Sequence, residues 1–124
     1  MEIVLYDREL DVMQVLWEKG PSTVAEVRDA LADEMAYTTV LTYLRRMEEK
    51  GYVSHEEDGR AHRYRPLIER EHIRESALQR LTRRLFDGST EMVLSYLVSD
   101  RKLSEAELRR LRDLVDRRLP EEDR

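Results

Sequence analysis

The chain of 124 residues contains no cysteine, which excludes a disulfide framework and any metal site built from thiolates. No apolar run approaches the roughly 18 residues that a membrane-spanning helix requires. The N-terminus also lacks the basic stretch and apolar run of a secretory signal. These absences predict a cytoplasmic protein without membrane insertion. Hydrophobic residues make up 40% of the chain and charged residues another 40%, which limits the core that one copy can build.

The charge of the chain is unevenly distributed. The net charge of −5 resides in residues 1–66, whereas residues 67–124 are balanced. This acidity predicts weak non-specific binding to nucleic acid, because phosphate contacts supply most of that affinity. Within the acidic half, however, residues 35–47 contain no acid, and residues 59–65 contain three arginines, one histidine and no acid. Binding depends on the local face more than on the total charge, so a DNA-binding surface is compatible with this composition.

Two helices are predicted near the N-terminus. Apolar residues recur at helical spacing in the first of them, which is expected over residues 7–18 with Asp7 as its N-cap. Trp17 is expected in the core, with its indole N–H bound to a local partner. The residues from Thr23 to Glu26 form a capping box, which opens a second helix over about residues 23–32.

A third helix is predicted over residues 38–50, followed by a β-hairpin. Val40, Leu44 and Met47 form one apolar stripe on this helix, and polar residues occupy the opposite side. Gly51 ends the helix. Asp58-Gly59 separates two extended runs and is a strong signal for a hairpin turn. Helix, helix, helix and hairpin follow in the order of a winged helix-turn-helix domain, in which the third helix reads the major groove of duplex DNA.

The polar side of the third helix and the return strand of the hairpin supply the candidate DNA contacts. Threonine can touch base edges, arginine can pair with guanine, and cations contact phosphate. The predicted base or groove contacts are Thr39, Thr42, Tyr43 and Arg46. The predicted phosphate contacts are Thr38, Arg45, Lys50, Arg60, Arg63 and Arg65, with Thr38 acting as the helix cap or through the helix N-terminus. Two alternatives stay open: Tyr43 packs against a neighbouring side chain, and Arg45 pairs with Glu49.

The second half of the chain is predicted to form three helices, over residues 69–86, 90–99 and 104–119. Ser89 and Ser104 are the expected N-caps of the last two. The apolar surface of these helices is large, and there is no sheet for it to cover. Because an exposed patch of this size marks an association surface, we expect a homodimer. The alternative is that this segment folds back on its own winged domain.

The predicted fold is therefore mainly α with a small β-hairpin wing. A winged helix-turn-helix domain is expected over residues 1–67, and a C-terminal helical dimerisation domain over residues 68–124. The predicted dimer interface consists of Phe86, Met92, Val93, Tyr96, Leu97, Leu108, Leu111 and Val115. The two winged helix-turn-helix domains of such a dimer would contact two half-sites on DNA.

Several segments resemble the penicillinase and methicillin-resistance repressors, the BlaI/MecI family. They are Leu5-x3-Glu9-x2-Val12-Met13-x2-Leu16-Trp17, Thr39-Val40-x-Thr42-x-Leu44-x-Arg46-Met47-x2-Lys50-Gly51, Tyr64-x-Pro66 and Phe86-Asp87-Gly88-Ser89. The resemblance covers nearly the whole chain in the right order. It implies a homodimeric repressor that binds a pseudo-palindromic operator. It also implies release through a membrane sensor-protease that cuts the dimerisation domain, at the bond matching Ser95–Tyr96, where the family has Asn and Phe.

Two other functions are compatible with parts of the sequence. His55 and His62 lie on facing strands of the predicted hairpin, but a metal or catalytic site needs a third convergent ligand and a pocket. The histidines are therefore expected to be surface or wing residues, and no enzyme activity, metal or cofactor is predicted. A winged domain used only for contact with another protein would account for the acidic half. The polar and basic face of residues 38–65 and the family resemblance favour DNA instead.

Overall fold

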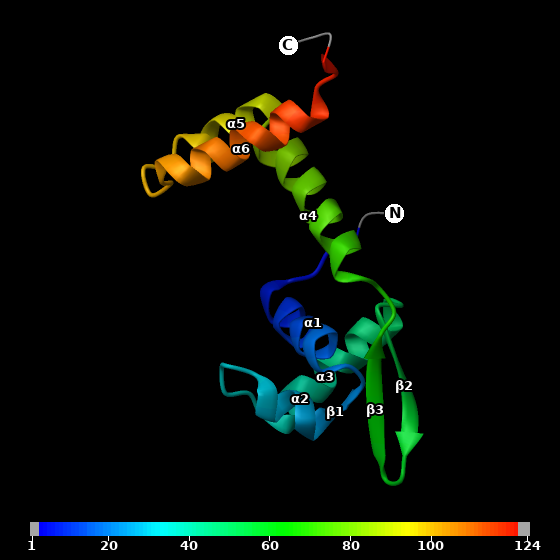
Figure 1. Ribbon diagram of the computed structural model, residues 1–124. Coiled ribbons are helices and arrows are strands. Elements are labelled where there is room, and N and C mark those ends of the chain that lie inside the picture. Colours follow the sequence, from blue (N-terminus) through cyan, green and yellow to red (C-terminus); the bar gives the residue numbers. More distant parts are fainter. Residues whose placement is uncertain (1–2, 122–124) are drawn as a thin grey trace. The chain divides into compact units, whose positions relative to one another are not determined.

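The computed structural model describes residues 3–121. It divides into two compact units, the first ending at Leu78 and the second beginning at Gln79. The elements are α1 (Asp7–Lys19), β1 (Ser22–Thr23), α2 (Val24–Ala30), α3 (Tyr37–Glu49), β2 (Val53–Asp58), β3 (Ala61–Pro66), α4 (Arg70–Leu85), α5 (Thr90–Val98) and α6 (Glu105–Arg118) (Figure 1). No helix among the described residues is long and apolar enough to cross a membrane.

The first unit has the predicted winged helix-turn-helix fold. Helices α1, α2 and α3 pack on one another, and an antiparallel sheet with strand order β1-β3-β2 lies beside them (Figure 1). In the β2–β3 hairpin Asp58 pairs with Ala61, so the turn residues are Gly59 and Arg60. Arg60 therefore lies in the turn, which corrects its expected place on the return strand. Gly59 has φ +66°, a conformation that glycine adopts without strain.

Strand β1 was not predicted from the sequence. Its two residues, Ser22 and Thr23, pair with Tyr64 and Arg63 of β3. A strand of two residues is too short to show the alternation of polar and apolar side chains by which strands are recognised. Its existence depends on β3, which comes about forty residues later in the chain.

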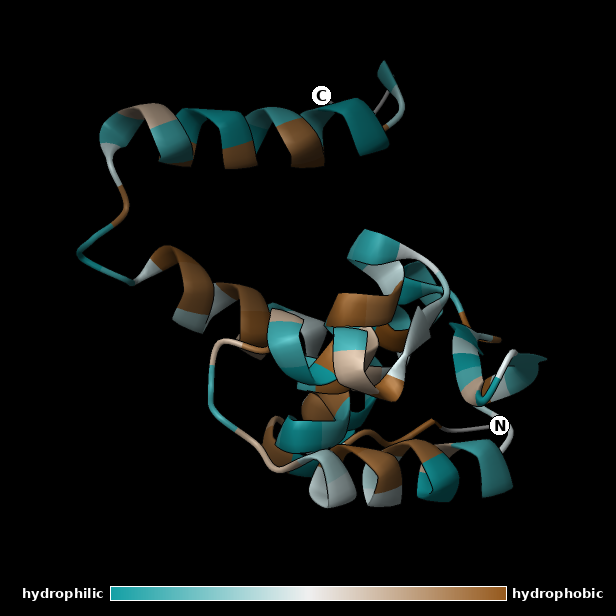
Figure 2. Cartoon of the chain, turned by 90° about the horizontal axis from the view of Figure 1, so that it is seen from below, coloured by the Kyte–Doolittle hydropathy of each residue, from teal (hydrophilic) through white to brown (hydrophobic). Residues whose placement is uncertain are grey.

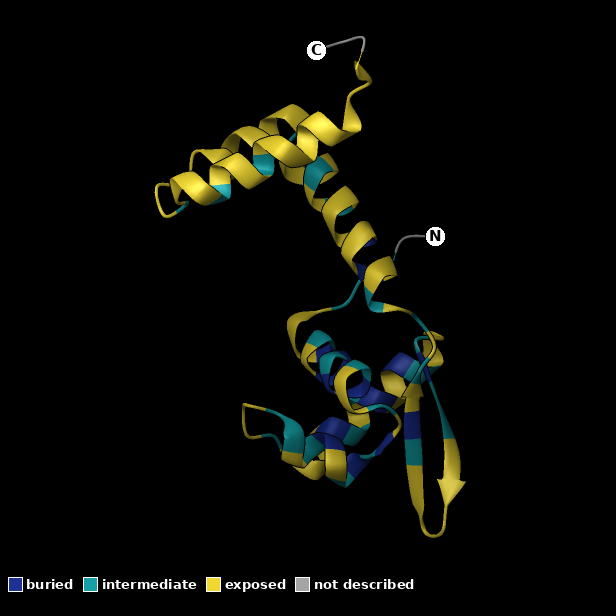
Figure 3. Cartoon of the chain, viewed as in Figure 1, coloured by how far each residue is buried: buried dark blue, intermediate teal, exposed yellow. Residues whose placement is uncertain are grey.

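The core of the first unit lies between its three helices and the sheet. The buried apolar residues are Val12, Met13, Val15, Leu16, Val24, Val27, Val40, Leu44, Met47, Val53 and Tyr64 (Figure 3). The predicted apolar stripe of α3 is thus confirmed. Trp17 packs at the edge of this core, and its Nε1–H donates to the carbonyl oxygen of Ile68 at 2.9 Å. That partner is far away in sequence, so the expectation of a local partner was wrong.

The N-cap of α1 differs from the predicted one. Tyr6 has the extended conformation of an N-cap, with φ −81° and ψ 162°, and Asp7 is the first helical residue. The backbone N–H of Tyr6 donates to Oε1 of Glu9 at 3.1 Å. Asp7 is therefore not the cap, because its backbone is already helical and the non-helical residue before the first turn is Tyr6.

Capping of the next two helices follows the prediction in one case only. The capping box of α2 is confirmed: Thr23 Oγ1 accepts from the N–H of Glu26 at 3.2 Å, and Glu26 Oε1 accepts from the N–H of Thr23 at 3.1 Å. The N-cap of α3, in contrast, is Ala36, which makes no side-chain capping bond. Thr38 lies inside the first turn of α3, so its expected role as a cap was wrong.

The first half of α4 belongs to the first unit. Ile73 and Ser76 are buried, and Ser76 Oγ both accepts from the N–H of Ile3 and donates to its carbonyl oxygen, each at 3.1 Å. The first unit consequently extends to Leu78, past the boundary expected at residue 67.

The second unit consists of the end of α4 together with α5 and α6. The predicted caps are confirmed, because Ser89 Oγ accepts from the N–H of Met92 at 3.0 Å and Ser104 Oγ accepts from that of Glu107 at 3.1 Å. None of its residues from 79 to 121 is buried (Figure 3). Hydrophobic residues nevertheless follow one side of α6 (Figure 2). The unit therefore presents amphipathic helices without a core of its own.

Candidate nucleic-acid interface

The side of α3 opposite its apolar stripe is exposed. Thr38, Thr39, Thr42, Arg45 and Arg46 all lie there, because the helical period separates them from the buried stripe. The hydroxyl of Thr42 donates to the carbonyl oxygen of Thr38 at 2.8 Å. Its methyl group and its free lone pairs are still available to a ligand. Three of the four predicted groove contacts, Thr39, Thr42 and Arg46, are thus brought together on one face with two predicted phosphate contacts, Thr38 and Arg45.

Tyr43 packs partly against the core and also lies beside a predicted base contact. Its ring centroid is 5.9 Å from Cζ of Arg46, a cation–π distance. The alternative that Tyr43 packs against a neighbouring side chain therefore describes this structure. The ring restricts the orientation of the Arg46 guanidinium, which reduces the entropy that the arginine would lose on pairing with a base.

Arg45 and Glu49 are both exposed on the last turns of α3. Among the ion pairs of residues 3–121, none joins these two side chains, although their spacing allows it. The Arg45 guanidinium is consequently not engaged by a carboxylate within the described protein.

Lys50 has a role inside the protein. Its Nζ lies 3.2 Å from Oε2 of Glu9, whose side chain is only 2% exposed. It also lies 5.5 Å from the ring centroid of Tyr6 and 6.0 Å from that of Tyr52. A buried carboxylate without a partner is costly. A DNA phosphate at Lys50 would have to compete with Glu9, so this geometry speaks against the predicted phosphate contact.

Arg63 is similarly occupied. Its Nε and Nη2 lie 3.0 and 2.9 Å from Oδ2 of Asp58, and its Nη1 lies 3.0 Å from Oε1 of Glu26. Nη1 also donates to the carbonyl oxygen of Pro21 at 3.1 Å. Hydrogen bonds with the backbone and the side chain of Thr23, and then the nearby Arg63, lower the pKa of Glu26. Arg63 therefore ties the hairpin to α2, which disfavours its predicted contact with phosphate.

The remaining predicted cations lie at the surface of the hairpin. Arg60 is exposed in the turn, and Arg65 is exposed on β3, where its Nε donates to Ser54 Oγ at 3.0 Å. Neither has a carboxylate partner among residues 3–121. Together with Arg45 and Arg46, they are the arginines of α3 and the hairpin that have no carboxylate partner within residues 3–121.

The two wing histidines meet as expected, but in an arrangement that does not suit a metal. The rings of His55 and His62 are stacked with centroids 4.3 Å apart. Nitrogen lone pairs lie in the plane of each ring, so stacked rings do not direct them at one ion. His55 Nδ1 instead lies 2.8 Å from both carboxylate oxygens of Glu48. Within residues 3–121 no three His, Cys, Asp or Glu side chains converge as metal ligands.

The Glu48–His55 contact was missed by sequence reasoning. Glu48 comes from α3 and His55 from β2, so the contact joins the expected recognition helix to the hairpin. No local signal predicts it, because it depends on how the hairpin folds back on α3.

The predicted dimer interface is largely exposed. Tyr96 is 69% and Leu97 59% exposed, and Met92, Leu108 and Val115 are exposed as well. Phe86, Val93 and Leu111 are partly buried, and the ring of Phe86 contacts the edge of Tyr96 with centroids 5.3 Å apart. The interface predicted from the sequence leaves out further exposed apolar residues of the same helices, which are Leu85, Leu94, Val98, Leu114 and Leu119.

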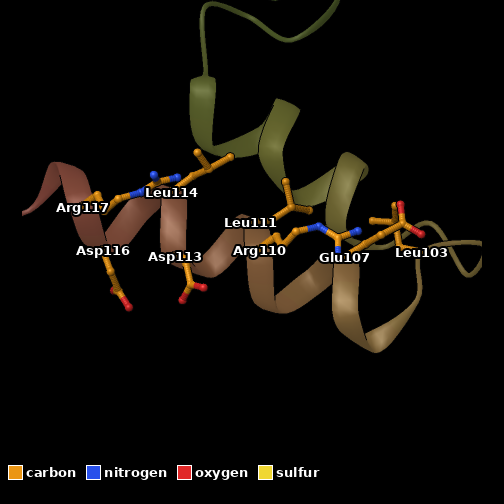
Figure 4. A pocket seen from close by; sticks show the side chains of 8 residues that line it. All are labelled: Leu103, Glu107, Arg110, Leu111, Asp113, Leu114, Asp116 and Arg117. Atoms are coloured by element: carbon orange, nitrogen blue, oxygen red, sulfur yellow. The ribbon is translucent and has the colours of Figure 1, made fainter.

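A hollow of about 780 Å³ lies along α6. Leu111 and Leu114 point to one side of the helix, and Asp113 and Asp116 point to the other (Figure 4). The bond Ser95–Tyr96 lies inside α5, where the backbone is helical.

Comparison with known proteins relates the whole arrangement to one family. Residues 5–117 match the model of the family described as Penicillinase repressor. The chain is 43% identical over 72 residues to the Transcriptional regulator BlaI of Mycobacterium tuberculosis, an alignment that covers 56% of this chain and 52% of that protein. It thus spans only about half the length of that relative. The Penicillinase repressor of Bacillus licheniformis is 30% identical over 113 residues, with 89% of this chain and 88% of the relative covered.

A solved structure shares the fold of the winged unit. It is the solution structure of the Bacillus licheniformis BlaI monomeric form in complex with the blaP half-operator. The similarity has a TM-score of 0.50 at 30% sequence identity and covers 58% of this chain and 90% of that one.

Proposed function

The chain belongs to the penicillinase repressor family, and on that premise we propose that it is a transcriptional repressor that binds operator DNA as a homodimer. The observation that carries the proposal is the exposed face of α3, which contains threonines and arginines beside a hairpin with two further exposed arginines. Such a face fits the major groove, with the hairpin following the phosphate backbone. The half-operator complex of the Bacillus licheniformis relative supports the same use of the winged unit.

Specific recognition falls to α3. In the proposed complex Arg46, whose guanidinium lies beside the ring of Tyr43, pairs with guanine, and Thr39 and Thr42 contact base edges. Arg45, Arg60 and Arg65 contact phosphate, and Thr38 does so near the N-terminus of the helix. Lys50 and Arg63 instead hold the domain together through Glu9, Glu26 and Asp58.

Dimerisation falls to the second unit. Its residues from 79 to 121 include none that is buried, yet its helices present many exposed apolar side chains. A second copy of the same surface, related by a two-fold axis, would cover them. A symmetric dimer matches an operator whose half-sites form an inverted repeat.

Release of the operator by proteolysis is the finer part of the proposal. A cut at Ser95–Tyr96 by a membrane sensor-protease would split α5 and separate Tyr96 from Phe86. The apolar surface that forms the dimer would then be divided, and the dimer would dissociate. Each winged unit would bind a half-site on its own. Mass analysis of the protein from cells exposed to a β-lactam tests this step. A fragment ending at Ser95 is expected, and a chain that stays intact while repression is relieved would contradict it.

Selection of bound sequences from a random duplex library, with the full chain at moderate salt, tests DNA recognition. We expect an inverted repeat with half-sites about one helical turn apart. Recovery of no motif from a folded dimer would contradict the proposal and favour a winged domain that contacts another protein.

A further inference from the structure

Arg70, the first residue of α4, carries a guanidinium group for which the protein supplies no hydrogen-bond acceptor. Within residues 3–121 its Nε is the only buried side-chain nitrogen or oxygen atom without a hydrogen-bond partner. No carboxylate in the described part of the chain pairs with this guanidinium either. The group lies over the ring of Trp17, with Cζ 5.4 Å from the ring centroid. A buried donor without an acceptor costs free energy, so this arginine requires an explanation.

A hollow of about 460 Å³ opens beside this guanidinium. It lies where strand β3 ends and α4 begins, and it belongs entirely to the first unit. Sites for small organic molecules have volumes of roughly 300–1,000 Å³ and mainly apolar walls with a few polar groups. The residues that line the hollow, four of them apolar, are Trp17, Pro66, Leu67, Ile68, Glu69 and Arg70. The hollow therefore has the size and the composition of such a site.

The walls of the hollow are anchored by hydrogen bonds. The indole Nε1–H of Trp17 donates to the carbonyl oxygen of Ile68 at 2.9 Å, which joins α1 to the segment after β3. The backbone N–H of Leu67 donates to the carbonyl oxygen of Tyr52 at 2.8 Å. The side chain of Leu67 nevertheless remains 51% exposed. Because these walls are already held in place, a ligand would bind with little loss of conformational entropy in the protein.

The chemistry of the hollow suits a small carboxylate with an apolar body. The terminal nitrogens of Arg70 have no recorded partner among residues 3–121 and are not buried, so a ligand can reach them. A planar guanidinium pairs with a carboxylate through two parallel hydrogen bonds. Trp17 and Leu67 offer apolar surface to the rest of the ligand. Glu69 lines the same hollow, and its negative charge disfavours a multiply charged anion such as phosphate.

We propose that this hollow binds a small organic carboxylate, whose carboxyl group pairs with Arg70 and whose apolar body packs on Trp17 and Leu67. The site uses none of the residues assigned to DNA or to the dimer interface, so it does not rest on the proposed function. The ligand would contact α1, the end of the wing and the start of α4 at once. It would therefore stabilise the first unit by mass action.

Two probes of nearly the same shape test the site in the full wild-type chain. Hydrocinnamate carries a carboxylate on an apolar body, and hydrocinnamide is its neutral counterpart. Trp17 is the only tryptophan of the chain, so its fluorescence reports binding at the hollow itself. We expect a saturable change with hydrocinnamate and a dissociation constant of about 1 mM or lower. The amide should bind about tenfold more weakly, because it cannot form the charge-assisted pair.

Arg70→Gln removes the charge and should weaken the binding of hydrocinnamate about tenfold, with little effect on the amide. Arg74→Gln is the matched control, one turn further along α4 at an exposed arginine that pairs with Glu71, and it should bind as the wild type does. The absence of a saturable change with the wild type would overturn the site. So would equal affinity of the wild type for acid and amide, a comparison that needs no variant, or equal affinity of Arg70→Gln and wild type for the acid. None of these measurements involves DNA, so their outcome is independent of the proposed function.

Discussion

The two units of the chain are both built mainly from amphipathic helices, but they treat their apolar side chains differently. In the first unit α1, α2 and α3 close on one another and on the sheet, and eleven apolar side chains form a buried core. In the second unit, over residues 79–121, no side chain is buried, and Leu85, Tyr96 and Leu97 are each more than half exposed. A chain of this size can thus keep one unit self-contained and leave the other for association.

Because of this difference, the stability of the two units should depend differently on protein concentration. Interactions inside the first unit stabilise it at any protein concentration. In the proposed dimer, apolar contacts of the second unit with another copy would stabilise it only by mass action, so their effect would depend on protein concentration.

The largest effect is expected from a charge on the exposed face of the second unit. Leu97→Glu should dissociate the dimer, because the carboxylate would have to be buried without a partner. Operator affinity should fall by about 10²- to 10⁴-fold, since the two winged units would no longer bind as a linked pair. Sedimentation velocity and operator titration measure the two effects. Lys102→Glu, in the loop before α6, should leave both unchanged, and a dimeric Leu97→Glu protein would refute the interface.

A core substitution in the first unit should be nearly as severe but of a different kind. Leu44→Ala creates a cavity beneath α3 and should cost about 2–5 kcal/mol of unfolding free energy. The single tryptophan, Trp17, reports unfolding of this unit by fluorescence in urea. The loss should be the same at low and high protein concentration. Leu97→Ala should instead shift the urea transition only at protein concentrations at which the dimer forms. The same shift at all concentrations would show that the second unit does not depend on another copy for its stability.

Arg46→Ala should affect recognition without affecting stability. We expect a loss of about 1–3 kcal/mol in operator binding and a relaxed preference at one base pair per half-site. Repeating the selection with the variant measures both. Arg46→Lys keeps the charge but loses the bidentate fork, so it should share the relaxed preference. An unchanged operator affinity would exclude Arg46 as a base contact.

Lys50→Gln should act on the folded unit rather than on DNA. It removes the cation beside the buried Glu9 carboxylate and should destabilise the first unit by about 1–2 kcal/mol, a value limited by the partial exposure of Lys50. The salt slope of DNA binding should stay the same, because Lys50 contacts no phosphate in the proposed complex. A shallower salt dependence of DNA binding, with an unchanged free energy of unfolding, would instead identify Lys50 as a phosphate contact.

The smallest effect concerns the pH dependence of the first unit. The folded state lowers the pKa of Glu26, mainly through its hydrogen bond with Thr23, so its ionised form is favoured by folding. The stabilisation is present above the ordinary carboxyl pKa and is lost as the pH falls through the lowered one. Glu26→Gln should therefore be less stable than the wild type at neutral pH and approach it in acid. Urea midpoints across this range measure the difference, and a constant gap would contradict the assignment.

Local signals explain why most of the fold was predictable. The capping boxes at Thr23 and Ser104 and the stripe on α3 each involve residues close in sequence, and the structure confirms them. The hairpin is confirmed as well, but its turn consists of Gly59 and Arg60, one residue later than the Asp58-Gly59 signal. The failures were of two kinds. At Tyr6 and Ala36 a helix begins without a typical capping side chain, so propensity pointed to the wrong residue. Strand β1 exists only because β3 pairs with it.

The candidate site was predictable as a face but not as a set of contacts. The helical period alone places Thr39, Thr42 and Arg46 on the exposed side of α3. Whether an arginine or lysine on that side is available to DNA depends on acids brought near it by folding. Lys50 and Arg63 look like Arg45 and Arg60 in the sequence, yet only the first two are engaged by carboxylates.

The sequence by itself determined the order of helices and strands, the apolar faces and the family, because these depend on the spacing of neighbouring residues. The tertiary structure alone decided which charges pair within the protein and which helices acquire a core. These features join residues tens of positions apart. Their energies depend on burial and on distance in space, which spacing along the chain does not specify.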